Sequence, residues 1–562
     1  MKVVIVGGVA GGATAAARIR RLDERAEIIV FERTGYVSYA NCGLPYYVGG
    51  VIEEEGALTL QTPEAFRARF RVDVRVRHEV TALHPERKAV SVRNLLTDES
   101  WEESYDKLIL SPGAKPTQPR LSGTDSDRVF TLRTVEDTLR IRRFVETARP
   151  KSAVLAGGGY IGLEMAENLR ELGLDVTVVQ RPRQLMSPLD YDMACFVHQK
   201  LRQKGIRLKL GSTVTGFRGE DEGVATLLEG EPSLRADMVL LSIGVTPDTH
   251  LAKEAGLTLG VKGSIVVNDR METSHPDIYA VGDAVQVTHT VTGQPALISL
   301  AGPANKQGRI AADNICGGDS HYHGSMGSSV LKLFDMTIAA AGLSETAALA
   351  AGFDCDSVVL SPANHATYYP GATLLTMKVT YERGSLRILG AQVIGSQGAD
   401  KRIDVLATAI HAGMTAEDLK DLDLAYAPPY ASAKDPVNMA GFMIENLAEG
   451  QVRQCHWHQM DMLPEGAVRL DVRTEREYER GHAEGFINIP LDELRGRMDE
   501  LPADCPVYIM CQSGLRSYIA CRILSQNGYD CVNFSGGYRF YRTVVQDAAA
   551  AERAKPCGME LD

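Results

Sequence analysis

Short apolar runs alternate with helical patterns at the start of the chain. Residues 2–6 form an apolar run, and after a glycine-rich turn residues 13–21 have helical periodicity. Residues 27–31 form a second apolar run. Continuous apolar runs of this length indicate strands that are buried on both faces, as in a parallel sheet. The order of strand, helix and strand predicts a βαβ unit.

The same order recurs about 150 residues later. Residues 153–156 and 176–179 are apolar runs, and residues 163–171 between them have helical periodicity. Each unit carries a glycine-rich turn after its first strand. The glycines are Gly7, Gly8, Gly11 and Gly12 in the first unit and Gly157, Gly159 and Gly162 in the second. Two such turns between a strand and a helix predict two dinucleotide sites.

The two turns differ in how well they fit the pattern G-x-G-x-x-G. The second fits in full, whereas Val9 stands where the first needs its middle glycine. The remaining glycines still allow a pyrophosphate to approach the backbone at a helix N-terminus. Glu32, at the end of the second strand, is placed to accept hydrogen bonds from a ribose. Gln180 holds the matching place in the second unit and is followed by Arg181, so both NADH and NADPH stay open.

Two further local patterns carry candidate chemistry. Residues 273–284 are expected to form a buried strand that ends at Gly282 and Asp283, where the carboxylate is placed to bind a polyol chain. Cys42 precedes Gly43-Leu44-Pro45, which is typical of a first helical turn. The helix dipole and free N–H groups lower the pKa of such a thiol from about 8.5 to roughly 3.5–7.5. We therefore expect Cys42 to be a thiolate at neutral pH, with a buried inert cysteine as the alternative.

Composition favours a cytoplasmic enzyme of several domains. The 562 residues exceed what one core holds. A net charge of −12 without a basic run argues against nucleic acid as a partner. The chain enters its first strand at residue 2 and has no apolar stretch of about 18 residues, so we expect neither a signal peptide nor a membrane span. Ten scattered cysteines suit a reducing compartment better than a disulfide framework.

The first glycine turn, Gly282-Asp283 and Ser111-Pro112-Gly113 together resemble the FAD domain of the flavoprotein disulfide reductase family, over residues 1 to about 445. This resemblance implies an α/β fold class with two Rossmann-like dinucleotide-binding domains, for FAD and NAD(P), followed by an α+β dimerisation domain that makes a homodimer. In the dimerisation domain, residues 374–381 and 386–394 are expected to be strands and residues 402–412 a helix.

The C-terminal part resembles a rhodanese domain, an α/β module, over about 85 residues from Ala467. Cys511 and Arg516 are separated by four residues, one fewer than in the Cys-x5-Arg loop of protein tyrosine phosphatases. A tighter ring of backbone N–H groups suits a single sulfur anion better than a phosphate. Cys511 is therefore expected to carry a persulfide sulfur and Arg516 to add positive charge, while Asp471 and Arg473 stabilise the domain.

These resemblances imply domain boundaries. They are 1–112 and 247–324 for the FAD-binding domain, 113–246 for the NAD(P)-binding domain, 325–445 for the dimerisation domain, 446–462 for a polar linker, 463–550 for the rhodanese domain and 551–562 for a tail. In the linker, Cys455, His456 and His458 suggest a metal site. No second ligand pair lies nearby in the sequence, so no metal is expected.

Glutathione-reductase-like members of the family carry a second cysteine five positions after the first, but here Tyr47 stands there. The other sulfur then has to come from the substrate or from oxygen chemistry. Single-cysteine members reduce CoA disulfide, persulfide or polysulfide, or are NADH oxidases and peroxidases that use a cysteine sulfenic acid. The latter place a histidine in the first glycine turn, where this chain has Ala10, and no histidine precedes His78.

The chain thus resembles the CoA-disulfide reductase–rhodanese fusion proteins. The NADH oxidase or peroxidase is the alternative, and a pure sulfurtransferase with a vestigial flavin domain is a third hypothesis. The resemblance implies FAD, NAD(P)H and coenzyme A, bound or as substrate, and small sulfur substrates as partners. The catalytic residues it implies are Cys42, Cys511, Tyr368, Tyr426 and Arg516. The two tyrosines would reach Cys42 from the partner subunit, although core packing is an equal explanation for each.

The binding residues are implied in the same way. FAD and NAD(P)H would be held by Gly7, Gly8, Ala10, Gly11, Glu32, Arg33, Asn41, Val80, Ser111, Gly113, Asp283, Gly157, Gly159, Tyr160, Ile161, Gly162, Glu164, Gln180 and Gly244. CoA would be held by Thr14, Arg18, Arg21, Ser38, Asn305 and Lys434. Thr14, Arg18 and Arg21 share one helical face, which suits a phosphorylated ligand, with a solvated basic face as the alternative.

Overall fold

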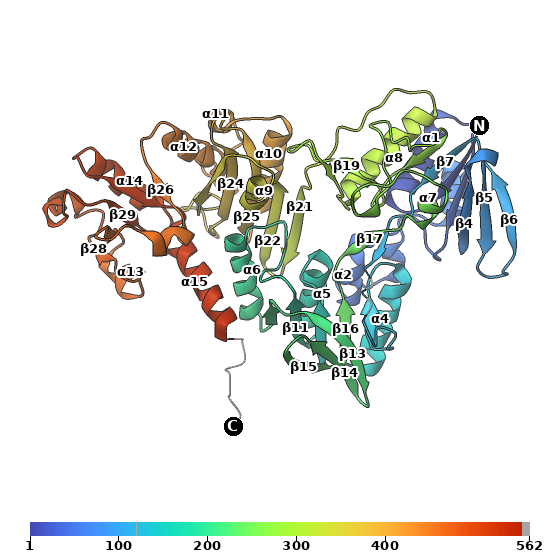
Figure 1. Ribbon diagram of the computed structural model, residues 1–562, viewed down its shortest axis with the longest axis horizontal. Coiled ribbons are helices and arrows are strands. Elements are labelled where there is room, and N and C mark those ends of the chain that lie inside the picture. The colour runs from blue at the N-terminus through green and yellow to red at the C-terminus, as the bar shows by residue number, and fades with distance from the viewer. Residues whose placement is uncertain (118, 120, 554–562) are drawn as a thin grey trace. The chain divides into compact units, whose positions relative to one another are not determined.

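The computed structural model describes residues 1–117, 119 and 121–553, and their contacts divide the chain into two compact units. One unit consists of Met1–Arg183 and Gly205–Gly327. The other consists of Gln184–Lys204 and the described residues from Ser328 onward. Figure 1 follows the chain from blue at the N-terminus towards red at the C-terminus. Of the tail expected at 551–562, residues 554–562 lie outside the described residues.

A five-stranded parallel sheet carries the first glycine turn, with the strand order β18-β7-β1-β2-β3. Its strands are β1 (Lys2–Val6), β2 (Glu27–Glu32), β3 (Asp73–Val76), β7 (Lys107–Leu110) and β18 (Ile278–Ala280). Helix α1 (Ala10–Leu22) follows β1 and packs against α8 (Ala301–Ile315). Val3, Val4 and Ile5 are fully buried, as the continuous apolar run predicts.

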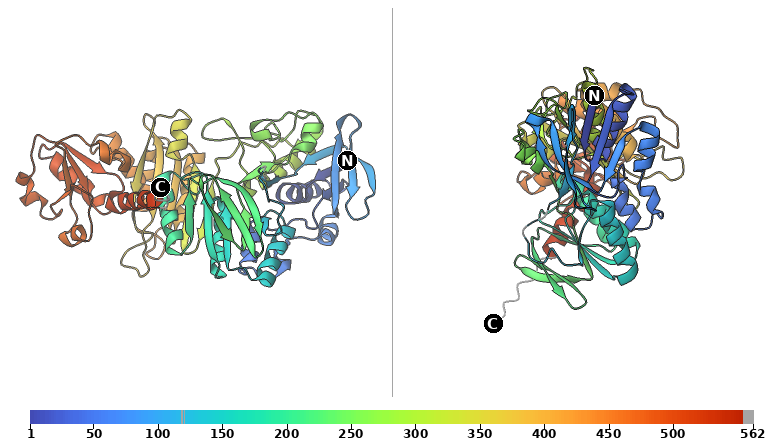
Figure 2. Two further views of the ribbon diagram at one scale, coloured as in Figure 1. Left: turned by 60° about the horizontal axis from the view of Figure 1, so that its bottom comes forward. Right: turned by 90° about the vertical axis from the view of Figure 1, so that its right-hand side faces the viewer.

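A second five-stranded parallel sheet repeats this design around the second glycine turn, in the order β12-β11-β10-β16-β9. Its strands are β9 (Val129–Thr131), β10 (Ser152–Ala156), β11 (Asp175–Gln180), β12 (Arg207–Leu210) and β16 (Met238–Leu241). Helix α5 (Tyr160–Glu171) follows β10. The antiparallel strands β13 (Val214–Glu220), β14 (Gly223–Leu228) and β15 (Glu231–Ala236) are the green strands at the front of the left view in Figure 2. Two Rossmann-like sheets are thereby confirmed.

The first glycine of each turn is required by a close backbone approach. Gly7 has φ +97°, and a Cβ there would lie 2.1 Å from the Ser111 carbonyl oxygen. Gly157 has φ +116°, and a Cβ there would lie 2.2 Å from the Ser242 carbonyl oxygen. No other residue avoids both the steric clash and the left-handed backbone strain. The two turns are therefore held against their sheets in the same way.

The second unit begins with a five-stranded antiparallel sheet in the order β21-β22-β25-β24-β23. Its strands are β21 (Ser329–Leu333), β22 (Met336–Gly342), β23 (Cys355–Leu360), β24 (Thr376–Glu382) and β25 (Ile388–Gly395). Helix α10 (Ala399–His411) packs on β22 and β25. This α+β arrangement confirms the fold class expected for a dimerisation domain.

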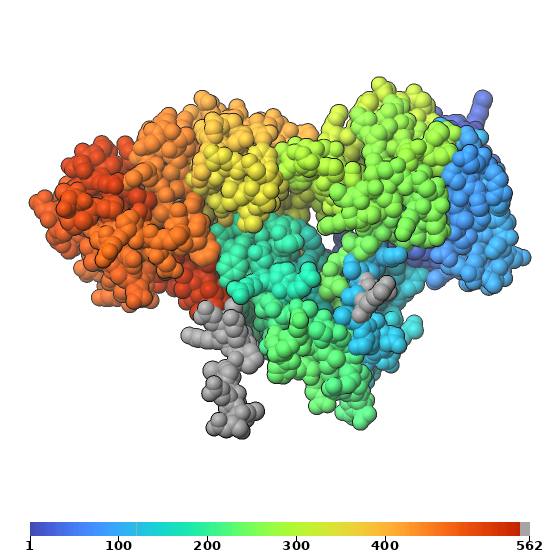
Figure 3. Space-filling view, viewed as in Figure 1, coloured from blue at the N-terminus to red at the C-terminus, as the bar shows by residue number. Residues whose placement is uncertain are grey.

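The last domain contains a five-stranded parallel sheet in the order β26-β30-β29-β27-β28 and forms the orange-to-red surface in Figure 3. Its strands are β26 (Gln454–Cys455), β27 (Val468–Asp471), β28 (Ile487–Asn488), β29 (Val507–Met510) and β30 (Cys531–Phe534). Its helices include α13 (Glu475–Glu479), α14 (Leu515–Ser525) and α15 (Gly537–Arg553). The active loop expected at Cys511 joins β29 to α14.

Residues 446–462, predicted to be a polar linker, are largely structured. Helix α12 (Pro436–Ala448) extends into it, β26 pairs with β30, and a 3-10 helix spans Trp457–Met462. One of its polar side chains is bound to the preceding domain, since His456 Nε2 lies 2.9 Å from an Asp356 carboxylate oxygen. The segment therefore belongs to the sheet of the last domain.

Two other expectations change. The strand expected at 273–284 is limited to β18, because the chain turns at Asp277, where φ is +68°. Residues 184–204 were expected in the NAD(P)-binding domain, yet they belong to the second unit. Within that unit helix α6 (Tyr191–Gln203) packs against α15 and β25, which bury the Phe196 and Val197 side chains. Among the residues the structure describes, no helix has the length and apolarity that a membrane crossing needs.

Candidate functional site

Both glycine turns end at a helix whose N-terminus has no side-chain cap. Neither α1 nor α5 has an acidic residue in its first turn or a capping side chain, whereas Thr134 caps the helix α4 (Val135–Ala148). The first N–H groups of α1 and α5 are therefore available to an anion. The residues present fit a dinucleotide pyrophosphate in each place, and Ala10 and Ile161 lie in these first turns.

Each turn is also tied to the end of the next strand. The Gly8 N–H donates to Glu32 Oε2 at 2.9 Å, and the Gly158 N–H donates to Gln180 Oε1 at 2.9 Å. The expected ribose ligands Glu32 and Gln180 thus hold equivalent positions. Glu32 is a buried carboxylate, whereas Gln180 is a neutral amide. Gln180 therefore would not repel the 2′-phosphate of NADPH.

A small cavity lies at the carboxyl end of the first sheet. Its volume is about 50 Å³, and Gly7, Arg33 and Val80 line it together with Asp248. Arg33 Nη2 lies 2.9 Å from Asp248 Oδ2, which fixes the guanidinium at the edge of the cavity. Three of the residues expected to hold FAD are therefore gathered at one place. Ser111 and Gly113 follow β7, Gly244 follows β16, and Tyr160 begins α5.

Arg133 links two of the expected FAD residues, and the sequence pattern did not single it out. Its Nη2 donates to Asp283 Oδ2 at 2.7 Å. With the Asn41 amide turned to satisfy its neighbours, that side chain donates to the Arg133 carbonyl at 3.0 Å and accepts from Arg133 Nη1 at 3.1 Å. Arg133 therefore joins the residue next to Cys42 to the Gly-Asp carboxylate, across a sequence separation that no local motif reveals.

Cys42 lies in a 3-10 turn, Asn41–Gly43, that leads into α2 (Leu44–Val48). Its side chain is exposed in this chain, yet burial by surrounding atoms raises the pKa of its thiol, and the Glu164 and Asp283 carboxylates raise it further. Arg133 acts in the opposite direction and lowers it. Among the protein groups, burial and these two carboxylates thus oppose the lowering of the Cys42 pKa that the helix start was expected to cause.

Glu164 lies on α5 and is close enough to influence Cys42. Burial raises the pKa of Glu164 to about 7, and the nearby Glu167 adds to this, while a hydrogen bond from the Tyr46 hydroxyl at 3.3 Å opposes it. A carboxyl group with this pKa exchanges its proton near neutral pH, which suits a proton donor or acceptor beside the sulfur.

The expected CoA residues are only partly brought together. Thr14 donates to the Asn305 amide oxygen at 2.6 Å, so these two lie side by side. Arg18 Nε is 2.6 Å from Asp313 Oδ1, and this ion pair occupies a guanidinium expected to bind a phosphate. Arg21 is exposed, and Ser38 has a left-handed backbone with φ +49°. The remaining residue, Lys434, is exposed in the second unit.

The two tyrosines expected at the active site are neighbours in the second unit. Their hydroxyl groups lie 2.7 Å apart, and the Tyr368 and Tyr426 side chains are 74% and 47% exposed. That much exposure argues against core packing, which was the equal explanation. The hydrogen bond to Tyr426 raises the pKa of Tyr368, since it is the neutral hydroxyl that donates.

The Cys511 sulfur is fully buried at the centre of its loop. The Gly514 N–H points at Cys511 Sγ from 3.1 Å, and the Ser517 hydroxyl from 3.4 Å. Gly514 has φ +97°, a left-handed conformation that turns its N–H inward. The loop therefore surrounds one sulfur atom with donors, as a persulfide-carrying loop requires.

Arg516 was expected to add positive charge to this loop, but an ion pair with Glu477 opposes that charge. Its two terminal nitrogens each lie 2.7 Å from an oxygen of Glu477. This bidentate pair lowers the pKa of Glu477 to about 2. Nearby, Asp471 and Arg473 form a buried ion pair at 2.7 Å, and Arg473 also donates to the Gly481 carbonyl, which is consistent with a stabilising role.

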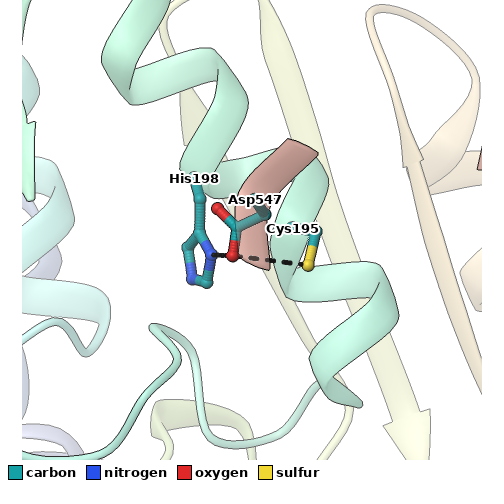
Figure 4. Close-up of side chains that lie close together, drawn as sticks. All are labelled: Cys195, His198 and Asp547. Atoms are coloured by element: carbon teal, nitrogen blue, oxygen red, sulfur yellow. Dashed lines mark hydrogen bonds and ion pairs between the residues drawn. The ribbon is translucent and has the colours of Figure 1, made fainter. Parts of the chain in front are cut away.

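A buried cluster on α6 and α15 was not found from the sequence (Figure 4). Asp547 accepts from His198 Nδ1 at 3.0 Å, from the Tyr191 hydroxyl at 3.1 Å and from Cys195 Sγ at 3.6 Å, and it pairs with Arg202. His198 Nε2 accepts the Leu185 N–H at 3.0 Å. Every polar group of this cluster is satisfied within the protein, so it stabilises the contact of α6 with α15.

Family models match three stretches of the chain. The model of the pyridine nucleotide-disulphide oxidoreductases matches residues 1–308, and that of their dimerisation domain matches residues 328–436. The chain therefore belongs to the pyridine nucleotide-disulphide oxidoreductase family. More specifically, it combines the family's dimerisation domain with a rhodanese-like domain, whose model matches residues 459–542.

Three similar proteins cover most of this chain or nearly all of it. A coenzyme A disulfide reductase from Staphylococcus epidermidis is 38% identical over 442 residues, which are 78% of this chain and 99% of that protein. The crystal structure of reduced Bacillus anthracis CoADR-RHD is 47% identical, with a TM-score of 0.95 over 97% of this chain and 98% of that one. An NAD-dependent persulfide reductase from A. fulgidus is 38% identical, with a TM-score of 0.91 over 96% and 100%. The expected family and fold class are confirmed.

Proposed function

We propose that the chain is an NAD(P)H-dependent flavoenzyme that reduces the sulfur-sulfur bond of CoA persulfide, polysulfide or CoA disulfide at Cys42. The single observation that carries this proposal is the pairing of one redox cysteine, without a partner at position 47, with a buried sulfur-binding loop at Cys511 in the same chain. The similarity to a coenzyme A disulfide reductase and to a persulfide reductase supports it.

The bound flavin supplies a two-electron carrier between NAD(P)H and sulfur. The chain's own residues bind and orient the reactants. The free N–H groups of α1 and α5 take the two pyrophosphates, and Glu32 and Gln180 face the riboses. Arg133 keeps Asn41 and Asp283 in place beside Cys42.

Cys42 attacks CoA persulfide, forms a mixed disulfide with CoA and releases sulfide. Two electrons then cleave this disulfide and return the Cys42 and CoA thiolates. The overall reaction consumes one NAD(P)H and one proton for each persulfide reduced. Glu164, with a pKa of about 7, exchanges the proton of the Cys42 thiol. The hydroxyl pair of Tyr368 and Tyr426, contributed by the partner subunit of a homodimer, protonates the departing thiolate.

Cys511 receives sulfane sulfur and delivers it to CoA for reduction. The buried sulfur and the two donors that point at it support this role. The pantetheine arm of CoA is the carrier between the two cysteines. A cytoplasmic location belongs to the proposal and is supported by the nine described cysteines, all of which are free thiols.

The decisive experiment is an anaerobic titration of the enzyme with NADH and NADPH against CoA disulfide, CoA persulfide and polysulfide, with sulfide measured. Cys42→Ser should abolish turnover with every substrate, while Cys316→Ser serves as the matched control in the same unit. Cys511→Ser should abolish only the supply of sulfane sulfur, with Cys505→Ser as its control. Comparable NADH consumption with oxygen alone would instead favour the NADH oxidase.

A further inference from the structure

A cavity of about 280 Å³ lies in the second unit between α6 and α15. Gln512, the residue that follows Cys511, lines it, and so do Arg539 and Arg542 from α15 and Gln199 from α6. These side chains are neither among the residues expected to bind FAD nor among the donors to the Cys511 sulfur. The cavity therefore needs a separate explanation.

The two arginines in this cavity have no acidic partner. Among the described residues, no carboxylate forms an ion pair with Arg539 or Arg542. Arg539 donates to the hydroxyls of Ser361 at 3.1 Å and Thr376 at 2.9 Å, which hold the guanidinium without neutralising it. Burial lowers the pKa of Arg539, and the charge of Arg542 lowers it further. Two like charges are thus kept close together at an unfavourable electrostatic energy.

The rest of the lining offers hydrogen-bond donors and no carboxylate. Gln199 and Gln203 contribute amides from α6. Lys200 also lines the cavity, but its ammonium group is bound by both oxygens of Asp335 at 3.1 Å. Converging guanidinium and amide donors are the arrangement that binds tetrahedral oxyanions, because such an anion removes the repulsion between the cations.

The cavity is rigidly connected to the sulfur loop. The Arg539 N–H donates to the Gln512 carbonyl at 3.1 Å, and the Tyr538 N–H donates to the Cys511 carbonyl at 2.7 Å. An anion bound by Arg539 would therefore lie beside the loop that carries Cys511. The volume is near the lower end of the roughly 300–1,000 Å³ of ligand pockets, which suits a small anion or a single charged head group.

We propose that this cavity binds the oxyanion group of the sulfur compound that reacts at Cys511. The group is either the sulfonate end of a thiosulfate-like donor or the phosphate of a phosphorylated thiol. The assignment of the anion to a sulfur compound rests on the proposed role of Cys511. The anion site itself does not.

The test uses the full-length holoenzyme and two probes, thiosulfate and inorganic phosphate. Calorimetric titration gives the affinity of each, and thiocyanate formation from thiosulfate and cyanide gives KM and kcat. Arg542→Gln is the main variant, because this side chain is exposed and no described carboxylate pairs with it. Arg495→Gln is the matched control on an exposed arginine of the same domain. Arg539→Lys keeps the charge but loses the two-pronged geometry.

The expected result is that Arg542→Gln weakens anion binding about tenfold or more and raises KM in parallel with little change in kcat, since one charge-assisted contact is lost. Arg495→Gln leaves both unchanged. Loss of thiosulfate binding identifies the sulfonate, and loss of phosphate binding alone identifies the phosphorylated thiol. Equal affinities in wild type and Arg542→Gln for both probes would overturn the proposal. Intact anion binding without sulfur transfer would overturn the role of Cys511 and leave the anion site standing.

Discussion

Replacing Asp547 by asparagine should destabilise the contact between α6 and α15. The carboxylate is almost fully buried and accepts hydrogen bonds from His198 and Tyr191, while Arg202 pairs with its other oxygen. An asparagine of nearly equal volume offers one acceptor oxygen and turns its NH₂ group towards donors. The change therefore removes the charge and half of the acceptors without opening a cavity.

The size of the effect follows from the pKa of Asp547. Its partners, with His198 and Arg202 foremost, lower this pKa from 3.8 to about 2 against the opposing effect of burial. At about 1.4 kcal/mol for each pKa unit, the ionised form gains about 2.5 kcal/mol in the folded state. Breaking a buried pair typically costs about 3–5 kcal/mol, because the remaining charge is left unpaired. We expect Asp547→Asn to lower the free energy of unfolding of this unit by about 2–4 kcal/mol.

The assay is urea unfolding followed by tryptophan fluorescence. The chain has two tryptophans, so Trp101→Phe leaves Trp457 as the reporter. The Trp457 ring lies 6.2 Å from the ring of Tyr191, which belongs to the cluster. The matched control is Asp492→Asn, which removes an exposed carboxylate from the same domain and should change nothing.

The pH dependence provides a second check. Because the folded-state pKa of Asp547 is lowered, its contribution is complete above the unfolded value near 3.8 and is lost as the pH falls towards about 2. The difference between wild type and Asp547→Asn should therefore stay constant from about pH 5 to 8. A difference below about 0.5 kcal/mol at pH 7 would refute the reasoning, because a change that small is typical of exposed sites without partners.

Three further predictions concern the two sulfur sites. Glu164→Gln should lower the pKa of the Cys42 thiol, most clearly above pH 7 where Glu164 is ionised. The rate of Cys42 alkylation by iodoacetamide should then rise at a lower pH than in the wild type. An unchanged dependence of the alkylation rate on pH would contradict this. Gly514→Ala forces a side chain into a left-handed backbone at a cost of about 1–2 kcal/mol, so thiocyanate formation should fall while CoA disulfide reduction persists. Tyr368→Phe and Tyr426→Phe should each lower kcat with CoA disulfide about tenfold or more, and the double variant should lose no more than either one, whereas additive losses would separate their roles.

Each of these predictions has a control of the same chemistry. Glu171→Gln removes an exposed carboxylate from α5 and should leave the alkylation profile unchanged. Gly496→Ala places a Cβ where no atom lies within 4 Å. Tyr430→Phe removes an exposed hydroxyl close to Tyr426 and should leave kcat unchanged.

Local patterns predicted the parts of the site that depend on neighbouring residues. The glycine turns at Gly7 and Gly157, and the loops of Cys42 and Cys511, are short segments whose backbone geometry dictates their composition. Their positions on strands and helices were therefore visible in the sequence. The two βαβ units followed from the same periodicity, because parallel strands buried on both faces leave continuous apolar runs. The dimerisation and rhodanese domains were predicted from the family resemblance.

Most of the differences concern contacts between distant segments. Arg133 reaches Asp283 across 150 positions, and Glu477 reaches Arg516 across 39. Neither partner lies in a motif that points to the other, so the charged groups around the two cysteines could not be predicted from local patterns. In the same way, the polar composition of 446–462 indicated solvent, whereas its side chains find partners such as Asp356 in the preceding domain.

The position of α6 has a consequence for where such a chain can be shortened. It is the connection between β11 and β12 of the nucleotide-binding sheet, yet its buried face is covered by the final helix of the rhodanese-like domain. The relative from Staphylococcus epidermidis matches only 78% of this chain and yet nearly all of its own length. A copy of this chain shortened to that length would leave His198 and Phe196 without their cover. Within the second unit, α6 and the rhodanese-like domain thus share a buried contact, and shortening the chain before that domain would need new surface residues on α6.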